Sequence, residues 1–175
     1  MMFDDILDGS IEHAEALVRT ENRIILPRMY LLVGGNGDAK YSLNAFDRAL
    51  RKAGVGDLNL VKVTSILPPN ATPGLRADIP NGAVVFAAMG SITSSQPDDL
   101  LSAAVAIGLP TDKSAPGVLM EHSGHKPASV VEEEVRFMAE QALLDRDCEV
   151  ADIKSVSSEH RVVESGAAIA AVLMW

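Results

Sequence analysis

Apolar runs separated by short polar stretches recur along the chain, and their alternation predicts more strands than helices. Several runs follow one another with no helical pattern between them. This favours an α+β fold whose helices are layered on largely antiparallel or mixed sheet. Strands are expected at residues 29–35, 57–65, 83–93, 100–109, 117–123, 150–162 and 166–175.

Two stretches rich in turn-forming residues are expected to be loops. The first is GGNGDAK, residues 34–40, and the second is LPPNATPGLRADIPNG, residues 67–82. A loop as long as the second is more often functional than idle in a compact domain.

Three segments show helical periodicity. The clearest covers residues 42–54, with Ser42 expected to cap its start and Gly54 to end it. A longer helix is expected to open at Pro127, and a short amphipathic helix in residues 1–25, which read as an N-terminal extension. The residues expected to face inward are Leu43, Phe46 and Leu50 in the first helix and Val131, Val135, Met138 and Ala142 in the second.

Composition adds limits to this pattern. The 175 residues predict one domain, and 47% apolar with only 4% aromatic residues predicts a core of small aliphatic side chains. The net charge of −9 argues against nucleic-acid binding. The single cysteine, Cys148, fits a reducing compartment, and neither a signal peptide nor a membrane span is recognisable, so a cytoplasmic location is expected.

Asp47 is the first candidate for chemistry. At about 100° per residue it lies within about 60° of the predicted apolar stripe of its helix. One interpretation pairs it with a neighbouring arginine, Arg48 or Arg51. The other aims its carboxylate into a pocket for a cation, and a guanidinium is the best geometric partner.

Asn59 and Ser65 fall in one predicted strand, and their even spacing places them on the same face. A straight strand would hold them about 20 Å apart, so a shared site would need a sharp bend or a second subunit. An isolated asparagine near a strand start is also a common structural feature.

Glu121 directly follows an apolar strand. Acids in this position are often solvated, but one that emerges into a pocket is a candidate proton donor. The nearby His122 and His125 are three residues apart with no further ligand cluster, which is weak support for a metal.

Ser65 lies in LVKVTSILPP, between a β-branched run and two prolines. The chain has no Walker or Rossmann loop and no G-x-S-x-G motif, so nucleotide binding and conventional serine hydrolysis are disfavoured. A serine here can instead attack the preceding peptide bond. Elimination would then cut the chain and leave an N-terminal pyruvoyl group, which accepts electrons as pyridoxal phosphate does.

Four passages resemble the pyruvoyl-dependent arginine decarboxylases of archaea: LNAFDRALRKAGVGDLNL, VTSILPP followed by IPNGAVVFAAMGSI, VAIGLPTDKSAPGVLMEHSG, and SEHRVVESGAAIAAVLMW. The resemblance covers residues 26–175. It implies an αββα sandwich assembled as trimers or dimers of trimers, with active sites between protomers. It also implies conversion of L-arginine to agmatine, a polyamine precursor, with a covalent pyruvoyl group and neither metal nor pyridoxal phosphate.

The resemblance also implies roles for individual residues. Self-cleavage would separate Thr64 from Ser65, giving a β chain of residues 1–64 and an α chain of residues 65–175. Asn59 would act in the site and in self-processing, and Glu121 would donate a proton. The substrate-binding residues would be Asp47, which would hold the guanidinium, and Leu43, Gly56, Leu58 and Ile66.

The residue before the pyruvoyl serine is often serine in this family, and here it is Thr64. Its β-branch restricts the backbone and could change the rate of processing. Two alternatives stay open from the sequence. The chain could decarboxylate another amino acid, for example histidine or ornithine, or it could be an unprocessed, inactive homologue that serves as a scaffold or binding subunit.

Overall fold

The computed structural model describes residues 24–175, so the helix expected in residues 1–25 lies almost wholly outside the described part. The bounds of its elements are β1 Met29–Ala39, α2 Ser42–Lys52, β2 Asn59–Lys62, β3 Ile66–Leu67, β4 Thr72–Pro73, a 3-10 turn η1 Arg76–Asp78, β5 Val84–Ser94, β6 Leu100–Pro110, β7 Gly117–Gly124, α3 Ala128–Leu144, β8 Val150–Arg161 and β9 Ser165–Met174.

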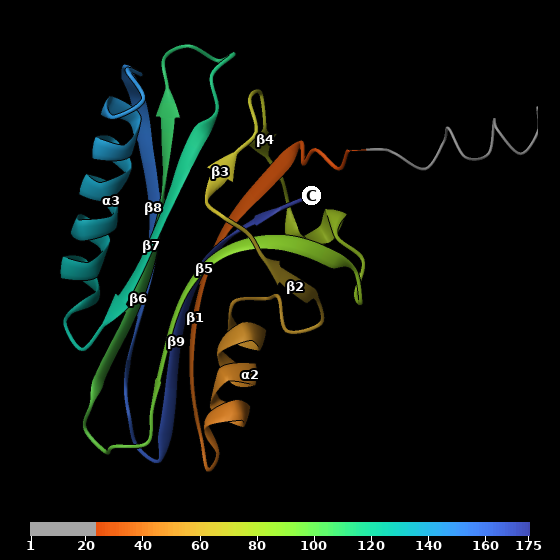
Figure 1. Ribbon diagram of the computed structural model, residues 1–175. Coiled ribbons are helices and arrows are strands. Elements are labelled where there is room, and N and C mark those ends of the chain that lie inside the picture. Colours follow the sequence, from red (N-terminus) through yellow and green to blue (C-terminus); the bar gives the residue numbers. More distant parts are fainter. Residues whose placement is uncertain (1–23) are drawn as a thin grey trace, which may run out of the picture.

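The described residues form two sheets and two helices, which confirms the predicted α+β class. One sheet has the order β2-β5-β9-β1-β4 and is mixed, because β2 and β4 pair in parallel with their neighbours. The other has the order β3-β7-β6-β8 and is antiparallel throughout. The sheets face one another, with α2 against the first and α3 against the second (Figure 1).

The core lies mainly between the two sheets, and strand β9 shows how the sequence builds it. All ten of its residues are buried. Its even-numbered positions, such as Ala168 and Val172, face the second sheet, whereas odd-numbered positions such as Ile169 face α2. A strand covered on both faces needs apolar residues at every position, and SGAAIAAVLM supplies them almost throughout.

Helix α2 packs on β1 through small residues, and this corrects the loop predicted at residues 34–40. That stretch is the second half of β1, paired with β9 as far as Ala39 and Ser165. A Cβ at Gly35 would lie 2.2 Å from the carbonyl oxygen of Ala49, so only glycine allows α2 to approach this closely. Gly35 and Gly37, which suggested a turn, serve helix–sheet packing instead, and Gly34 allows the close approach of β8.

Several details of the predicted helices are also wrong. The fully buried residues of α2 are Ala45 and Ala49, whereas Leu43 is 78% exposed. Ser42 makes no capping hydrogen bond, because Tyr41 occupies the cap position. In α3, Met138 is 38% exposed and Ala139 is buried in its place. The start of α3 agrees with the prediction to within one residue, and α2 ends at Lys52, two residues before the predicted Gly54.

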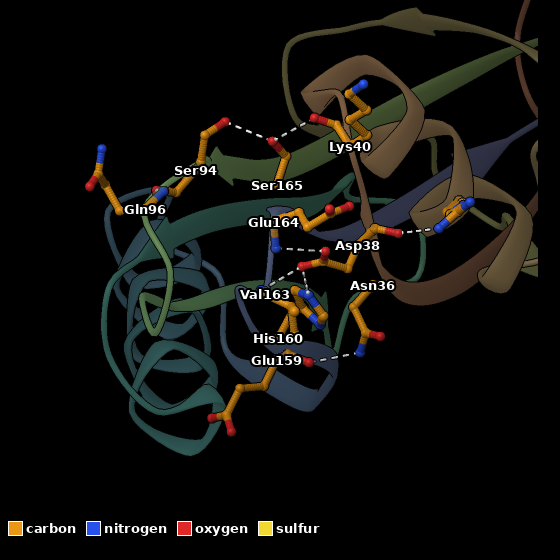
Figure 2. A network of polar contacts seen from close by, with 12 residues as sticks. Asn36, Asp38, Lys40, Ser94, Gln96, Glu159, His160, Val163, Glu164 and Ser165 are labelled. Carbon is orange, nitrogen blue, oxygen red and sulfur yellow. Dashed lines mark hydrogen bonds and ion pairs between the residues drawn. The ribbon is translucent and has the colours of Figure 1, made fainter.

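A polar network joins β1, β8 and the β8–β9 turn. It lies at the end of the molecule away from the C-terminus (Figure 1). The carboxylate of Asp38 lies 2.9 Å from His160 Nε2 and accepts hydrogen bonds from the N–H groups of Val163 and Glu164 (Figure 2). Burial alone would raise the pKa of Asp38. These hydrogen bonds and the nearby imidazole outweigh it and hold the pKa below its ordinary value.

Candidate active site

Ser65 lies where the chain crosses from one sheet to the other. Strand β2 belongs to the five-stranded sheet and β3, which begins at the next residue, belongs to the four-stranded sheet. Val63 still donates to Ala87 of the first sheet, and the Ser65 carbonyl already accepts from Leu119 of the second, at 2.9 Å. Backbone hydrogen bonds to one sheet before the candidate cleavage point and to the other sheet after it therefore fix its position.

Glu121 contacts the Ser65 hydroxyl directly. The antiparallel register of β3 and β7 places Ser65 opposite Leu119, which makes Glu121 its diagonal neighbour. Ser65 Oγ donates to Glu121 Oε2 at 3.0 Å, and both residues are partly buried. Two residues 56 positions apart thus form a hydroxyl–carboxylate pair at the strand crossing.

The backbone at Ser65 forms a tight turn. The N–H of Ile66 donates to the carbonyl oxygen of Thr64 at 2.8 Å, which closes a three-residue ring with Ser65 at its centre. The non-glycine residues with positive φ in the described part are Asn70, Asp98 and Asp147, so Ser65 has negative φ. The turn is therefore of the inverse γ type, the common and relaxed form.

Asp47 and its predicted companions form a second group. Asp47 and Leu43 lie one turn apart on an exposed face of α2, and Gly56 and Leu58 follow in the partly buried segment before β2. Asn59 opens β2, is exposed, and donates from its side chain to the Gly82 carbonyl at 2.8 Å. Among residues 24–175 no ion pair is recorded for Asp47.

The described residues contain no hydrogen bond or ion pair that joins this second group to Ser65 or Glu121. The pairing of Asp47 with Arg48 that the sequence left open is not made, because Arg48 donates to the carbonyl of Asp38. The candidate residues thus lie in two places on this chain, Ser65 with Glu121 at the strand crossing and Asp47 on α2.

A shallow pocket of about 160 Å³ borders the candidate cleavage point. Its lining consists of Ile25, Pro27, Val63, Thr64, Ile66, Pro68, Phe86 and Met174. A larger pocket of about 410 Å³ follows the proline-rich loop at residues 67–72 and also contains Lys113 and Asp152. None of the predicted site residues lines the larger pocket.

The two histidines near Glu121 lie beside different acids. His122 is 3.6 Å from Glu134 and His125 is 3.7 Å from Asp99. No group of three or more potential metal-ligating side chains occurs in the described part of the chain, and no helix there is long and apolar enough to cross a membrane.

Sequence reasoning missed the two backbone donors at this site, the N–H groups of Ile66 and Leu119. Every residue except proline has an N–H group, so no sequence pattern marks the few that serve chemistry. The local turn brings the Ile66 N–H to the Thr64 carbonyl, and the register of β3 against β7 brings the Leu119 N–H to the Ser65 carbonyl.

Comparisons with known proteins agree on one family. A sequence model of the pyruvoyl-dependent arginine decarboxylases matches residues 29–174. A curated relative of that name from Methanocaldococcus jannaschii is 39% identical over 150 residues, covering 86% of this chain and 91% of the relative. One from Methanococcus aeolicus is 41% identical over 149 residues, covering 85% of this chain and 90% of the relative. One from Pyrococcus furiosus is 34% identical over 154 residues, covering 86% of this chain and 97% of the relative.

Among solved structures, a pyruvoyl-dependent histidine decarboxylase aligns with 53% of this chain and 51% of its own. The two are 16% identical with a TM-score of 0.42, which is below the range that shows a shared fold.

Proposed function

This chain belongs to the pyruvoyl-dependent arginine decarboxylase family, and on that premise we propose that it decarboxylates L-arginine to agmatine and carbon dioxide after cutting itself between Thr64 and Ser65. The observation that carries the proposal is the 3.0 Å contact between Ser65 Oγ and Glu121 Oε2 at the strand crossing. A hydroxyl beside a carboxylate, next to the bond to be cut, is what self-cleavage requires.

The domain boundaries are part of this proposal. Residues 26–175 would form the catalytic domain, and the family match to residues 29–174 supports this extent. Cleavage would give a β chain of residues 1–64 and an α chain of residues 65–175. A cytoplasmic location is likewise proposed, on the basis of the single Cys148.

The residues around Ser65 fit a pyruvoyl group. Ser65 is one residue before β3, and its carbonyl is fixed by Leu119, so a group derived from it would stay beside Glu121 after the cut. The pyruvoyl group, when formed, supplies an electrophilic carbonyl for the substrate amine and accepts the electrons released with carbon dioxide. Glu121 would hold the proton that returns to the substrate α-carbon.

In the substrate-binding part of the proposal, Asp47 holds the guanidinium, and Leu43, Gly56, Leu58 and Ile66 line the pocket. A carboxylate and a guanidinium form two parallel hydrogen bonds, which favours arginine over histidine or ornithine. Asn59 would assist the chemistry at the residue from which the pyruvoyl group is formed.

A trimer, or a dimer of trimers, would unite the two partial sites by placing the Asp47 group of one protomer against Ser65 of another. Exposed apolar side chains support such an interface. Leu43 is 78% exposed, Val84 68% and Ile66 41%, and each lies on or beside an element that carries a predicted site residue.

Intact mass after purification, combined with a decarboxylation assay, tests the proposed function. We expect two fragments that split after residue 64, a blocked N-terminus on the larger one, and release of carbon dioxide from arginine but not from histidine or ornithine. A single chain of 18.6 kDa without activity would instead identify a scaffold homologue. Cleaved protein that prefers another amino acid would disprove the assignment of arginine.

A further inference from the structure

We propose that two backbone N–H groups divide the self-cleavage between them: that of Ile66 stabilises the oxyanion of the first step, and that of Leu119 stabilises the enolate of the second. The inference rests on the proposed self-cleavage at Ser65. It gives a chemical role to two backbone groups, whereas the proposed function assigned roles only to side chains.

The sheet register explains why the Ile66 N–H is available. Residues of an antiparallel pair alternate between bonded and non-bonded positions, and Ser65 bonds to Leu119. The next pair, Ile66 and Val118, is therefore non-bonded, so the Ile66 N–H points away from β7. Because β3 is the edge strand of its sheet, none of the strands within residues 24–175 lies on that side. The acceptor recorded for this N–H is the Thr64 carbonyl, at 2.8 Å.

The first step places charge on the oxygen that Ile66 contacts. Ser65 Oγ attacks the carbonyl carbon of Thr64, its proton passes to Glu121, and the carbonyl π electrons move onto the Thr64 oxygen. The bond between Thr64 and Ser65 nitrogen then breaks, the nitrogen takes the proton from Glu121, and an ester remains. A donor that already bonds the reacting oxygen stabilises this charge without reorganisation.

The second step places charge on the other carbonyl. Removal of the Ser65 α-proton by the regenerated carboxylate moves an electron pair onto the Ser65 carbonyl oxygen, which accepts from Leu119 at 2.9 Å. That pair then returns to form the bond between Cα and Cβ, and the carboxylate of Thr64 leaves from Cβ. Hydrolysis of the resulting enamine releases ammonia and gives the pyruvoyl group.

Both carbonyls that flank Ser65 thus have their own donor, and each donor faces the atom that becomes negative in a different step. The relaxed φ at Ser65 indicates that the site depends on these donors and on Glu121, rather than on left-handed backbone strain.

Replacing a residue by its α-hydroxy acid converts its N–H to an ester oxygen and keeps its side chain. In the Ile66 variant we expect an intact chain, with conversion slowed about 10²–10³-fold. The Leu119 variant loses the hydrogen bond to the Ser65 carbonyl, which the second step needs. We therefore expect the ester formed in the first step to accumulate. Hydroxylamine cleaves that ester and gives a Thr64 hydroxamate, which mass spectrometry detects separately from cleavage at the introduced backbone ester.

Wild-type rates in both variants would overturn the proposal, and so would ester accumulation in the Ile66 variant. Failure of the unsubstituted protein to cleave would refute the proposed function instead. A measurement independent of these variants uses a Ser65→Ala precursor with an isotope-labelled Thr64 carbonyl. Its infrared stretch should have the lowered frequency of a hydrogen-bonded group, and the frequency of an unbonded carbonyl would show that the Ile66 donor is absent.

Discussion

At the scale of single residues, the site consists of ordinary groups made unusual by their neighbours. Ser65 and Glu121 are each unremarkable in the sequence, and periodicity could suggest both but could not connect them. The connection comes from the pairing of β3 with β7, which places Ser65 opposite Leu119 and so makes Glu121, two residues further along β7, its diagonal neighbour. Long-range register of this kind depends on the whole sheet.

Glu121→Gln tests the proton-acceptor role. Glutamine can still hydrogen-bond Ser65 but cannot take its proton, so we expect self-cleavage to slow by about 10²–10⁴-fold. The half-time on denaturing gels measures this. Glu132→Gln is a matched control, because Glu132 also accepts from serine hydroxyls, those of Ser155 and Ser157, away from the site. Cleavage of Glu121→Gln at the control rate would remove Glu121 from this role.

At the scale of elements, the hydropathy pattern predicted most strands, but it missed the second half of β1, ran the strand of residues 57–65 past the end of β2 at Lys62, and predicted the packing of α2 poorly. The expected stripe used the largest apolar residues, but the contact with β1 is made by the smallest, Ala45 and Ala49 against Gly35 and Gly37. Close approach of a helix to a sheet selects small residues, and a local pattern cannot show that another element will lie so near.

Gly35→Ala tests this close approach. The new Cβ would meet the backbone oxygen of Ala49 at 2.2 Å, so α2 must shift, and we expect a loss of about 3 kcal/mol in the free energy of unfolding. Urea unfolding of a Ser65→Ala background, which stays a single chain, measures it. Gly124→Ala is the control, because its Cβ would meet only the flexible Lys126 side chain, at 3.2 Å or more. Equal stability of the two variants would contradict the packing argument.

Asp38→Asn tests the polar network between β1 and the β8–β9 turn. The folded state lowers the pKa of Asp38, so its stabilisation is present above the ordinary value of 3.8 and is lost as pH falls through the lowered one. We expect the variant to be less stable by about 1 kcal/mol near neutral pH.

This difference should shrink as pH falls below about 5, which urea unfolding of the Ser65→Ala background at each pH measures. Asp152→Asn is the control, because Asp152 is exposed in β8 and its side chain makes no hydrogen bond or ion pair among residues 24–175, so we expect little change in stability. A difference between Asp38→Asn and its parent that does not depend on pH would show that the charge of Asp38 is not what stabilises the network.

At the scale of the whole molecule, one chain carries Ser65 with Glu121 and, separately, the Asp47 group. The family resemblance suggested the residues of both groups, and the fold adds that Ser65 contacts Glu121 at the strand crossing whereas Asp47 lies on α2. Leu43, one helical turn from Asp47, is exposed, and an apolar side chain at the surface is what an interface between the proposed protomers would cover.

Mixing two inactive chains tests whether sites form between protomers. Asp47→Asn should cleave itself normally but bind arginine about 10²-fold more weakly, since a bidentate charge pair is lost. Ser65→Ala should remain uncut and inactive. Co-expressed in equal amounts, the two should restore roughly a quarter of the sites, those that take Ser65 from one chain and Asp47 from the other. No recovery in assemblies that contain both chains would place each site within one chain.

The interleaving of strands gives the proposed cut a further consequence. Strands β1 and β2 would belong to the short fragment, and β5, β9 and β4 to the long one, within the single sheet of order β2-β5-β9-β1-β4. The ten residue pairs between β1 and β9 would hold the fragments together without a covalent bond. An unfolded precursor can refold alone, but a matured molecule that unfolds must find its other half. Its recovery from denaturant would therefore depend on concentration, and maturation would be a step that the protein takes only once, after folding.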